Sequence, residues 1–305
     1  MQTTVCDVVE VQGVGLHSGE AARLTIHPSK ADDGIVFRRM DLPGTPSIPA
    51  RWDLVEQTPL CTRIRTTDGA SVSTIEHIMA ALAGCGVHNA RIDLDGPEVP
   101  ILDGSAVPFV RAILEVGRKD LERALKVVEV LRPVDVSNGH GHARLEPAEN
   151  LWIDFTIDFE DRAIGRQSKS LNLANGSFVH ELSDSRTFCR QSDVDQMRAS
   201  GLALGGTYEN AVVVDGDAVL TPGGFRHPDE AVRHKMLDAL GDLYLAGGPL
   251  LGRYTGERAG HALTNSLLRA LFSDPRNYRV TTVDGRRAVN LPGVGVDLAD
   301  APQAV

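Results

Sequence analysis

The sequence is poor in cysteine, in basic residues and in long apolar runs, and each shortage excludes a class of protein. Its four cysteines show no CxxC spacing, so we expect neither a cysteine-type zinc finger nor a disulfide framework. No uncharged apolar run approaches the ~20 residues that span a bilayer. The first residues also lack the charged start and apolar core of a signal peptide. A cytoplasmic protein without a membrane span is therefore expected.

Acidic residues outnumber basic ones by 41 to 31, which gives a formal net charge of −10 and argues against a general nucleic-acid binder. Several enzyme motifs are missing: GxGxxG after a strand, GxxxxGK(S/T), GxSxG and HExxH. What remains is an ordinary globular composition, 42% hydrophobic and 24% charged, in a chain of 305 residues that is long enough for two domains.

Short β-branched runs are mixed with a few helical stretches along the chain. Asp68-Gly69 and Asn138-Gly139 predict hairpin turns. Residues 118–125 are highly charged and are expected to be a connector, and the last thirty residues are expected to hold a strand or two and a frayed end. Helices are expected at about 73–86, 106–117, 190–204, 228–248 and 259–274. Strands and helices without regular βαβ alternation favour an α+β fold.

A polar stripe runs along the helix expected over residues 228–248. Pro228 suits its start and the Gly247-Gly248 pair suits its end. His234, Asp238 and Asp242 recur every four residues, so they share one side of this helix. An imidazole and a carboxylate one turn apart can chelate a divalent metal. A solvated polar face would show the same pattern.

A catalytic zinc site needs three protein ligands and an open position. His77 in the first helix offers a third ligand, and Glu76 could flank the same ion as a general base. With Ser73, however, Glu76 also fits a capping box. His261 starts a helix, where the helix dipole lowers the pKa of an imidazole unless a carboxylate offsets it. Paired with an aspartate, His261 could donate a proton to a leaving group.

Seven segments become recognisable together. They are GVGLHSGE (13–20), GIVFRRMDLPG (34–44), STIEHIMAALAGCGVHNARIDLDGPEVPILDGSAVPFV (73–110), SRTFC (185–189), GLALGG (201–206), VRHKMLDALGDL (232–243) and GHALTN (260–265). These segments, in this order along the chain, resemble those of the zinc-dependent UDP-3-O-acyl-N-acetylglucosamine deacetylases of lipid A biosynthesis. The resemblance implies a metal-dependent amidohydrolase that removes the N-acetyl group from UDP-3-O-acyl-N-acetylglucosamine and releases acetate.

The resemblance also implies roles for individual residues. The metal ligands would be His77, His234 and Asp238. They would hold Zn²⁺, although Fe²⁺ could occupy the same set. Glu76 would be the general base and His261 the general acid, paired with Asp242. Thr187 would stabilise the oxyanion, and Lys235 would line the site near the sugar and diphosphate. The implied substrate contacts are His17, Asp158, Phe159, Phe188 and Arg258.

The family fold has two α+β domains of similar topology, with helices packed between two sheets, a small insert in each domain, and the active site where the domains meet. We expect an N-terminal domain over residues 1–122, a C-terminal domain over 123–280 and a polar segment over 281–305. The second insert, about 190–220, would form an apolar passage for the acyl chain. Its candidate lining residues are Met197, Leu202, Ala203, Leu204 and Val212. A monomer is expected, with the acylated nucleotide sugar as its substrate.

Two departures from the family pattern lie beside the site. Asp184-Ser185 replace a small or apolar residue, and Thr264 and Ser266 flank Asn265 where the family often has Asn and Lys. These departures bear on acyl-chain preference or binding strength rather than on the reaction. Two alternatives stay open: a zinc amidohydrolase for another acylated amino-sugar nucleotide, and a non-catalytic nucleotide-binding paralogue.

Overall fold

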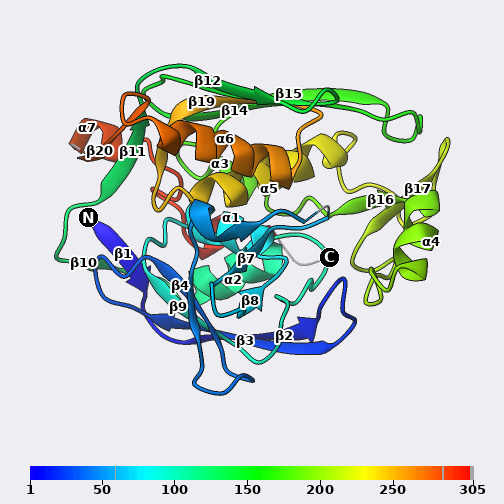
Figure 1. The fold of residues 1–305 in the computed structure, drawn as a ribbon, viewed down its shortest axis with the longest axis horizontal. Coiled ribbons are helices and arrows are strands. Elements are labelled where there is room, and N and C mark those ends of the chain that lie inside the picture. Colours follow the sequence, from blue (N-terminus) through cyan, green and yellow to red (C-terminus); the bar gives the residue numbers. More distant parts are fainter. Residues whose placement is uncertain (59, 284, 303–305) are drawn as a thin grey trace.

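Two large sheets form the outer layers of the molecule, and the main helices lie between them (Figure 1). The computed structural model describes residues 1–58, 60–283 and 285–302. Mixed sheets and interleaved helices make the fold α+β, as the sequence predicts. In the described part of the chain no helix is both long and apolar enough to cross a membrane.

The first large sheet comes from the N-terminal part of the chain. Its order is β2 (Val9–Val14), β3 (Ala21–Pro28), β9 (Ala90–Leu94), β4 (Ile35–Arg39), β5 (Ser47–Pro49). β3 pairs with β9 antiparallel, whereas β4 pairs with β9 parallel. A smaller sheet beside it contains β6 (Val55–Glu56), β7 (Arg63–Arg65) and β8 (Ser71–Val72). β7 and β8 flank Asp68-Gly69, which confirms the first predicted hairpin.

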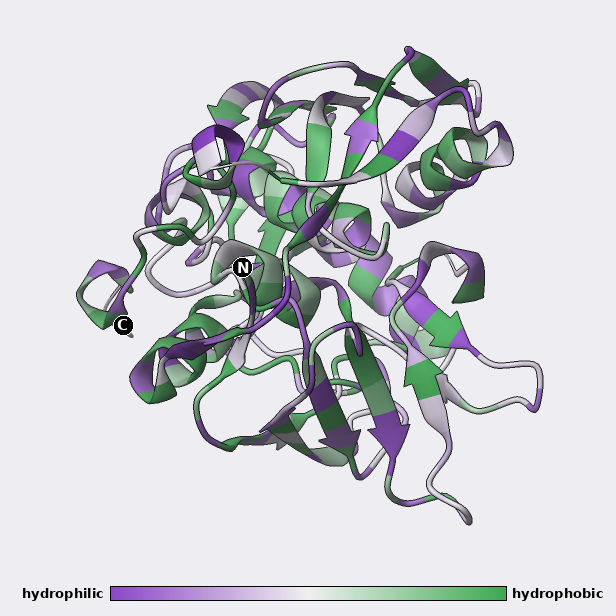
Figure 2. Ribbon diagram, turned by 90° about the vertical axis from the view of Figure 1, so that its left-hand side faces the viewer, coloured by the Kyte–Doolittle hydropathy of each residue, from purple (hydrophilic) through white to green (hydrophobic). Residues whose placement is uncertain are grey.

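The second large sheet is built around β19 (Leu250–Glu257). Its order is β12 (Val134–Ser137), β13 (His142–Glu146), β19, β11 (Lys126–Val130), β20 (Tyr278–Thr282), with β14 (Leu151–Asp158) also paired to β19 and β15 (Arg166–Asn172) to β14. β12 and β13 flank Asn138-Gly139, so the second predicted hairpin is confirmed. In β14 buried residues alternate with more exposed ones. Figure 2 shows hydrophobic and hydrophilic residues alternating along several strands.

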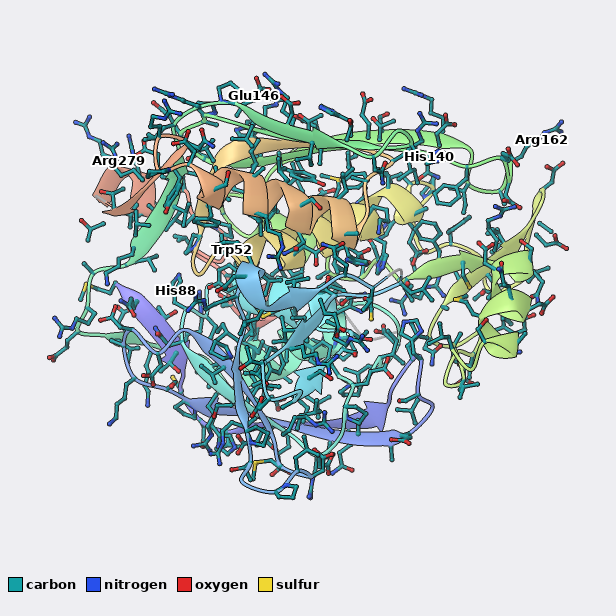
Figure 3. The ribbon with its side chains drawn as sticks, in the orientation of Figure 1. Trp52, His88, His140, Glu146, Arg162 and Arg279 are labelled. Atoms are coloured by element: carbon teal, nitrogen blue, oxygen red, sulfur yellow. The ribbon has the colours of Figure 1, made fainter. Side chains whose placement is uncertain are left out.

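Five helices contribute to the middle layer: α1 (Glu76–Gly84), α2 (Val107–Val116), α3 (Ser177–Glu181), α5 (Glu230–Tyr244) and α6 (His261–Ser273). Every residue of α1 is buried, because other elements cover this helix on all sides. α6 is tied to the N-terminal part of the chain through Trp52, whose ring stacks on Phe272 with centroids 4.9 Å apart (Figure 3).

Two short segments differ from the sequence-based expectation. Residues Arg118–Leu121 form a strand, β10, which pairs antiparallel with β1 (Gln2–Val5). The prediction of a connector over residues 118–125 is therefore wrong for these four residues. The end of the chain up to residue 302 is docked rather than frayed: Leu291 and Val296 are buried. Arg118 explains this docking, because its guanidinium donates hydrogen bonds to the carbonyl oxygens of Gly293 and Val296. The three-part domain division stays a prediction.

α1 and α5 approach each other so closely that a glycine is required at their contact. A β-carbon on Gly241 of α5 would lie 2.1 Å from the carbonyl oxygen of Glu76 in α1. That clash is with backbone rather than with a movable side-chain end, so one of the helices would have to shift. Gly241 therefore sets the spacing between the two helices that carry the candidate metal ligands.

We expect Gly241→Ala to lower the free energy of unfolding by about 1–3 kcal/mol, as overpacking in a well-packed interior does. The same shift should lower metal affinity, because it moves α1 relative to α5. Urea denaturation and metal titration would measure both effects. Gly96→Ala is a matched control, because the nearest atom to an added β-carbon there is 4.0 Å away. Equal behaviour of the two variants would contradict the role given to Gly241.

Candidate active site

Three of the sequence-predicted residues meet where α1 crosses α5. One nitrogen each of His77 and His234 and one oxygen of Asp238 all lie within 4.8 Å of one another, and all three residues are buried. Asp238 Oδ1 is 3.6 Å from His77 Nε2 and 3.3 Å from His234 Nε2. The two imidazole rings are nearly perpendicular, with centroids 5.0 Å apart. The geometry is that of a three-ligand cage.

The chemistry of this group fits a divalent metal ion. Asp238 Oδ1 is buried without a hydrogen-bond partner, a costly arrangement unless a cation supplies the missing contact. His234 donates through Nδ1 to the carbonyl oxygen of Ser185 at 3.0 Å, which leaves Nε2 to act as a ligand. Burial lowers the pKa of His234 to about 4, so its ring is neutral, as metal binding requires. Two imidazoles and one carboxylate suit Zn²⁺.

Lys235 fixes the other oxygen of the aspartate. Its ammonium group donates to Asp238 Oδ2 at 2.7 Å. Burial opposes a charged lysine, but the carboxylates of Asp238, Asp242 and Glu76 outweigh it and raise the pKa of Lys235. Lys235 therefore carries a positive charge at the edge of the cavity while it orients a candidate ligand.

Glu76 lies beside the three-ligand group, but not as a helix cap. α1 begins at Glu76 without any side-chain cap, so the capping-box interpretation with Ser73 is wrong. Glu76 Oε2 instead accepts a hydrogen bond from the backbone N–H of Thr62 at 3.0 Å. Burial raises the pKa of Glu76. A buried carboxylate with a raised pKa and one oxygen left for another partner can act as a proton acceptor and donor.

His261 faces Glu76 from the first turn of α6. Its Nε2 is 3.7 Å from Glu76 Oε1, and its Nδ1 is 2.8 Å from Asp242 Oδ2. Burial alone would lower the pKa of His261, but the charges of Asp242 and Glu76 raise it to about 9. The carboxylate needed to keep this helix-start histidine protonated is therefore present, and the imidazolium presents Nε2–H to the same space as Glu76.

A cavity of 760 Å³ reaches His234, Asp238 and His261. His17, Thr187, Phe188, Phe159 and Arg258 line it, together with Lys235. Both ring nitrogens of His17 are buried and lack hydrogen-bond partners, so they are available to a polar group in the cavity. Asp158 is not among the lining residues; its carboxylate lies 3.8 Å from the guanidinium of Arg166.

The insert forms the far end of this cavity and projects from the body of the molecule (Figure 1). It contains α4 (Gln191–Ala199) and the small sheet β16 (Phe188–Arg190), β17 (Val212–Asp215), β18 (Ala218–Val219). Met197, Leu202 and Ala203 line the cavity as expected, whereas Leu204 does not and is 56% exposed. Val212 does not line it either; its neighbours Ala211 and Val213 do, because successive strand side chains point to opposite faces.

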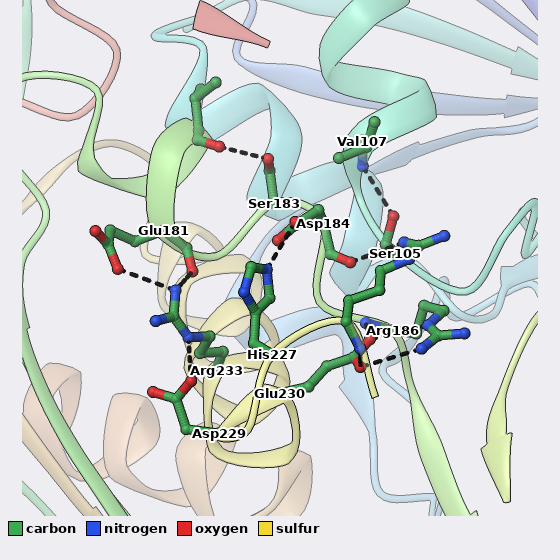
Figure 4. A network of polar contacts seen from close by, with 12 residues as sticks. Ser105, Val107, Glu181, Ser183, Asp184, Arg186, His227, Asp229, Glu230 and Arg233 are labelled. Atoms are coloured by element: carbon green, nitrogen blue, oxygen red, sulfur yellow. Dashed lines mark hydrogen bonds and ion pairs between the residues drawn. The ribbon is translucent and has the colours of Figure 1, made fainter. Parts of the chain in front are cut away.

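A buried ion pair that the sequence analysis missed holds the segment before Thr187 (Figure 4). The carboxylate of Glu230 accepts hydrogen bonds from both the backbone N–H and the guanidinium of Arg186, at 2.9–3.1 Å. Glu230 is completely buried and Arg186 is 7% exposed. The backbone N–H of Thr187 donates to the carbonyl oxygen of Gly104 at 2.8 Å. These contacts hold the segment that carries Ser185, whose carbonyl oxygen binds His234, and Thr187, which lines the cavity.

The buried charge of Arg186 depends on Glu230 as its counter-ion, so removing that counter-ion should destabilise the protein. Glu230→Gln leaves the Arg186 charge buried without its counter-ion, and we expect the free energy of unfolding to fall by about 3 kcal/mol or more. Thermal or urea unfolding would measure the loss. Glu146→Gln is the matched control, because this side chain lies at the surface (Figure 3) and should change stability by less than about 0.5 kcal/mol. Equal stabilities would contradict the role given to the buried pair.

The departures from the family pattern do not reach the cavity. Asp184 Oδ2 pairs with His227 Nε2 at 2.7 Å (Figure 4). Thr264 Oγ1 lies 3.0 Å from the hydroxyl of Tyr254, and Ser266 donates to the backbone of Ala262. None of these substituted residues is among the described residues that line the cavity. Asp184, Thr264 and Ser266 therefore have local partners of their own, whereas the hydroxyl of Ser185 is buried without a hydrogen-bond partner.

Comparisons with known proteins give the family of this chain. A family model described as UDP-3-O-acyl N-acetylglycosamine deacetylase matches residues 2–273. A protein of Anaeromyxobacter sp. (strain Fw109-5), named UDP-3-O-acyl-N-acetylglucosamine deacetylase, is 47% identical over 92% of this chain and 91% of its own length. Proteins with the same name from Phenylobacterium zucineum and Myxococcus xanthus are 48% and 45% identical over 88% and 97% of this chain, and over 92% and 93% of their own lengths. The chain therefore belongs to the UDP-3-O-acyl N-acetylglycosamine deacetylase family.

Proposed function

We propose that this chain is a zinc-dependent deacetylase that removes the N-acetyl group of UDP-3-O-acyl-N-acetylglucosamine and releases acetate in lipid A biosynthesis. The observation that carries the proposal is the group formed by His77, His234 and Asp238, with its unpartnered carboxylate oxygen, beside Glu76 and His261. Family membership supplies the substrate class.

His77, His234 and Asp238 would hold the metal ion. When bound there, Zn²⁺ supplies Lewis-acid polarisation of the amide carbonyl and a more acidic water. Fe²⁺ suits the same ligands. The protein contributes the cage, with His234 held by Ser185 and Asp238 held by Lys235. These hydrogen bonds orient the ligands before the metal arrives.

Glu76 and His261 would move the protons. Glu76 accepts a proton from the attacking water, and its burial supports this because a raised pKa brings a carboxylate closer to neutral pH. His261, kept cationic by Asp242, donates the proton from Nε2 to the departing amine. Each proton transfer of this kind contributes a rate factor of about 10²–10⁴.

The cavity would hold the rest of the substrate. The hydroxyl of Thr187 would donate to the oxyanion of the tetrahedral intermediate, a contact worth roughly 3–4 kcal/mol. Lys235 would supply a charge near the sugar and diphosphate, and His17, Phe159 and Arg258, which also line the cavity, would contact the nucleotide. The part lined by Met197 and Leu202 is suited to the acyl chain. Asp158 does not line the cavity, so its role as a nucleotide contact rests on the family resemblance alone.

The test combines metal analysis of the purified protein with an acetate-release assay. We expect about one metal ion per chain, and acetate released in equal amount to the free amine. Substrates with and without the 3-O-acyl group separate this proposal from an amidohydrolase for another amino-sugar nucleotide. Nucleotide binding without acetate release at any metal loading would favour the non-catalytic alternative. The cytoplasmic location and the monomeric state remain predictions from the sequence.

A further inference from the structure

Thr62 contacts two residues of the site and the start of α1, although no sequence pattern pointed to it. This residue is 2% exposed and lies between α1 and α5. Its backbone N–H donates to Glu76 Oε2 at 3.0 Å, and its hydroxyl donates to Asp242 Oδ1 at 2.5 Å. Its carbonyl oxygen accepts the N–H of Ile75, the residue before α1, at 3.3 Å. One residue thus touches the candidate base and the partner of the candidate acid.

The hydroxyl contact restricts the carboxylate of Asp242. Oδ1 accepts from Thr62 while Oδ2 faces Nδ1 of His261 at 2.8 Å. With a donor on each oxygen, the carboxylate has one orientation, and the imidazole ring that it holds is fixed as well. Without the hydroxyl, the carboxylate is free to rotate about its χ2 torsion, which is broad for aspartate.

We infer that Thr62 is a positioning residue. Its backbone N–H orients the base Glu76, and its hydroxyl orients the acid His261 through Asp242. This inference rests on the proposed function for the roles of those two groups. Thr62 does not line the cavity, so it acts through Glu76 and Asp242 rather than on the substrate. A displacement of about 1 Å at a reacting group can cost roughly 10²-fold in rate.

Thr62→Val tests the hydroxyl, because valine keeps the shape and the backbone N–H while it removes the donor. We expect kcat to fall about 10- to 100-fold, with KM and metal content within about twofold of the parent. Thr62→Ser restores the hydroxyl and should recover kcat to within about threefold. Thr4→Val is the matched control: Thr4 is also fully buried, and its hydroxyl oxygen accepts a hydrogen bond from Ser29 N–H, away from the site.

A second measurement does not depend on turnover. In metal-free protein, the proton on Nδ1 of His261 gives a downfield NMR signal while it is hydrogen-bonded to Asp242. We expect Thr62→Val to shift or broaden this signal, and Thr62→Ser and Thr4→Val to leave it in place. If Thr62→Val does not fold, Thr62→Ala takes its place with the same expected results.

The outcomes separate this inference from the proposed function. A parent protein that releases acetate, with Thr62→Val showing the parent's kcat and NMR signal, overturns the positioning role alone. A parent protein that releases no acetate overturns the proposed function, and the NMR comparison then decides whether Thr62 holds Asp242. A fall in kcat that serine does not rescue, or that Thr4→Val reproduces, also overturns the inference, because it would reflect packing.

Discussion

His234→Ala is expected to purify without a bound metal ion and to lose at least about 10³-fold in kcat/KM. The reason is that Lewis-acid stabilisation is worth several kcal/mol, and ~4 kcal/mol corresponds to a factor of about 10³. His234 is 2% exposed and its Nε2 lies 3.3 Å from Asp238 Oδ1, so its removal takes one of the three ligands out of a buried group. Metal analysis and acetate release on the same preparation would measure both losses.

His140→Ala is the control for the loss of a histidine. His140 lies in the exposed turn between β12 and β13 (Figure 3), and its removal should change neither metal content nor rate. Circular dichroism would establish that the His234→Ala protein is folded. If His234→Ala bound zinc as the parent protein does, the assignment of the metal ligands would be wrong.

His261→Ala should keep the metal ion and still lose about 10²–10⁴-fold in kcat, the range expected when a general acid is removed. The ligands remain in place because His261 contacts Asp238 only across 3.9 Å and is not part of the three-ligand group. KM should change much less than kcat, because the imidazolium acts on the leaving amine in the transition state. Steady-state kinetics at fixed metal loading would measure the two constants.

The contrast between these two variants is the sharper test. His234→Ala loses metal and rate together, whereas His261→Ala loses rate alone. A His261→Ala protein that had lost its metal would mean that His261 is a ligand. A His261→Ala protein with the parent's kcat would assign the proton donor to another group.

The helix periodicity alone predicted that His234, Asp238 and Asp242 share one side of α5, because their separation is fixed by 3.6 residues per turn. The structure divides that stripe between two tasks: Asp238 faces His77, and Asp242 faces His261. Spacing could not make this division, since both partners come from other elements. The resemblance to the family supplied it.

Residues that act through long-range contacts were beyond any spacing rule. Thr62 and Asp242 are 180 residues apart, and Arg186 and Glu230 are 44 apart. Glu230 is the first residue of α5, where a negative charge favours the helix start, so its sequence position already has a local explanation. Glu76 was open to the same error through its capping-box pattern. In both cases the local pattern was compatible with a residue whose partner is distant.

The contact at Gly241 protects the distance between the candidate metal ligands from substitutions elsewhere in the interior. Where two helices touch through a glycine, their separation is fixed by main-chain atoms, and side-chain volume does not enter. A change in the size of an apolar side chain elsewhere around α1 and α5 would then be met by repacking away from this contact, while the distance from His77 to Asp238 stays nearly constant. Such a change would cost stability, but the spacing between the metal ligands would still be set by this one small residue.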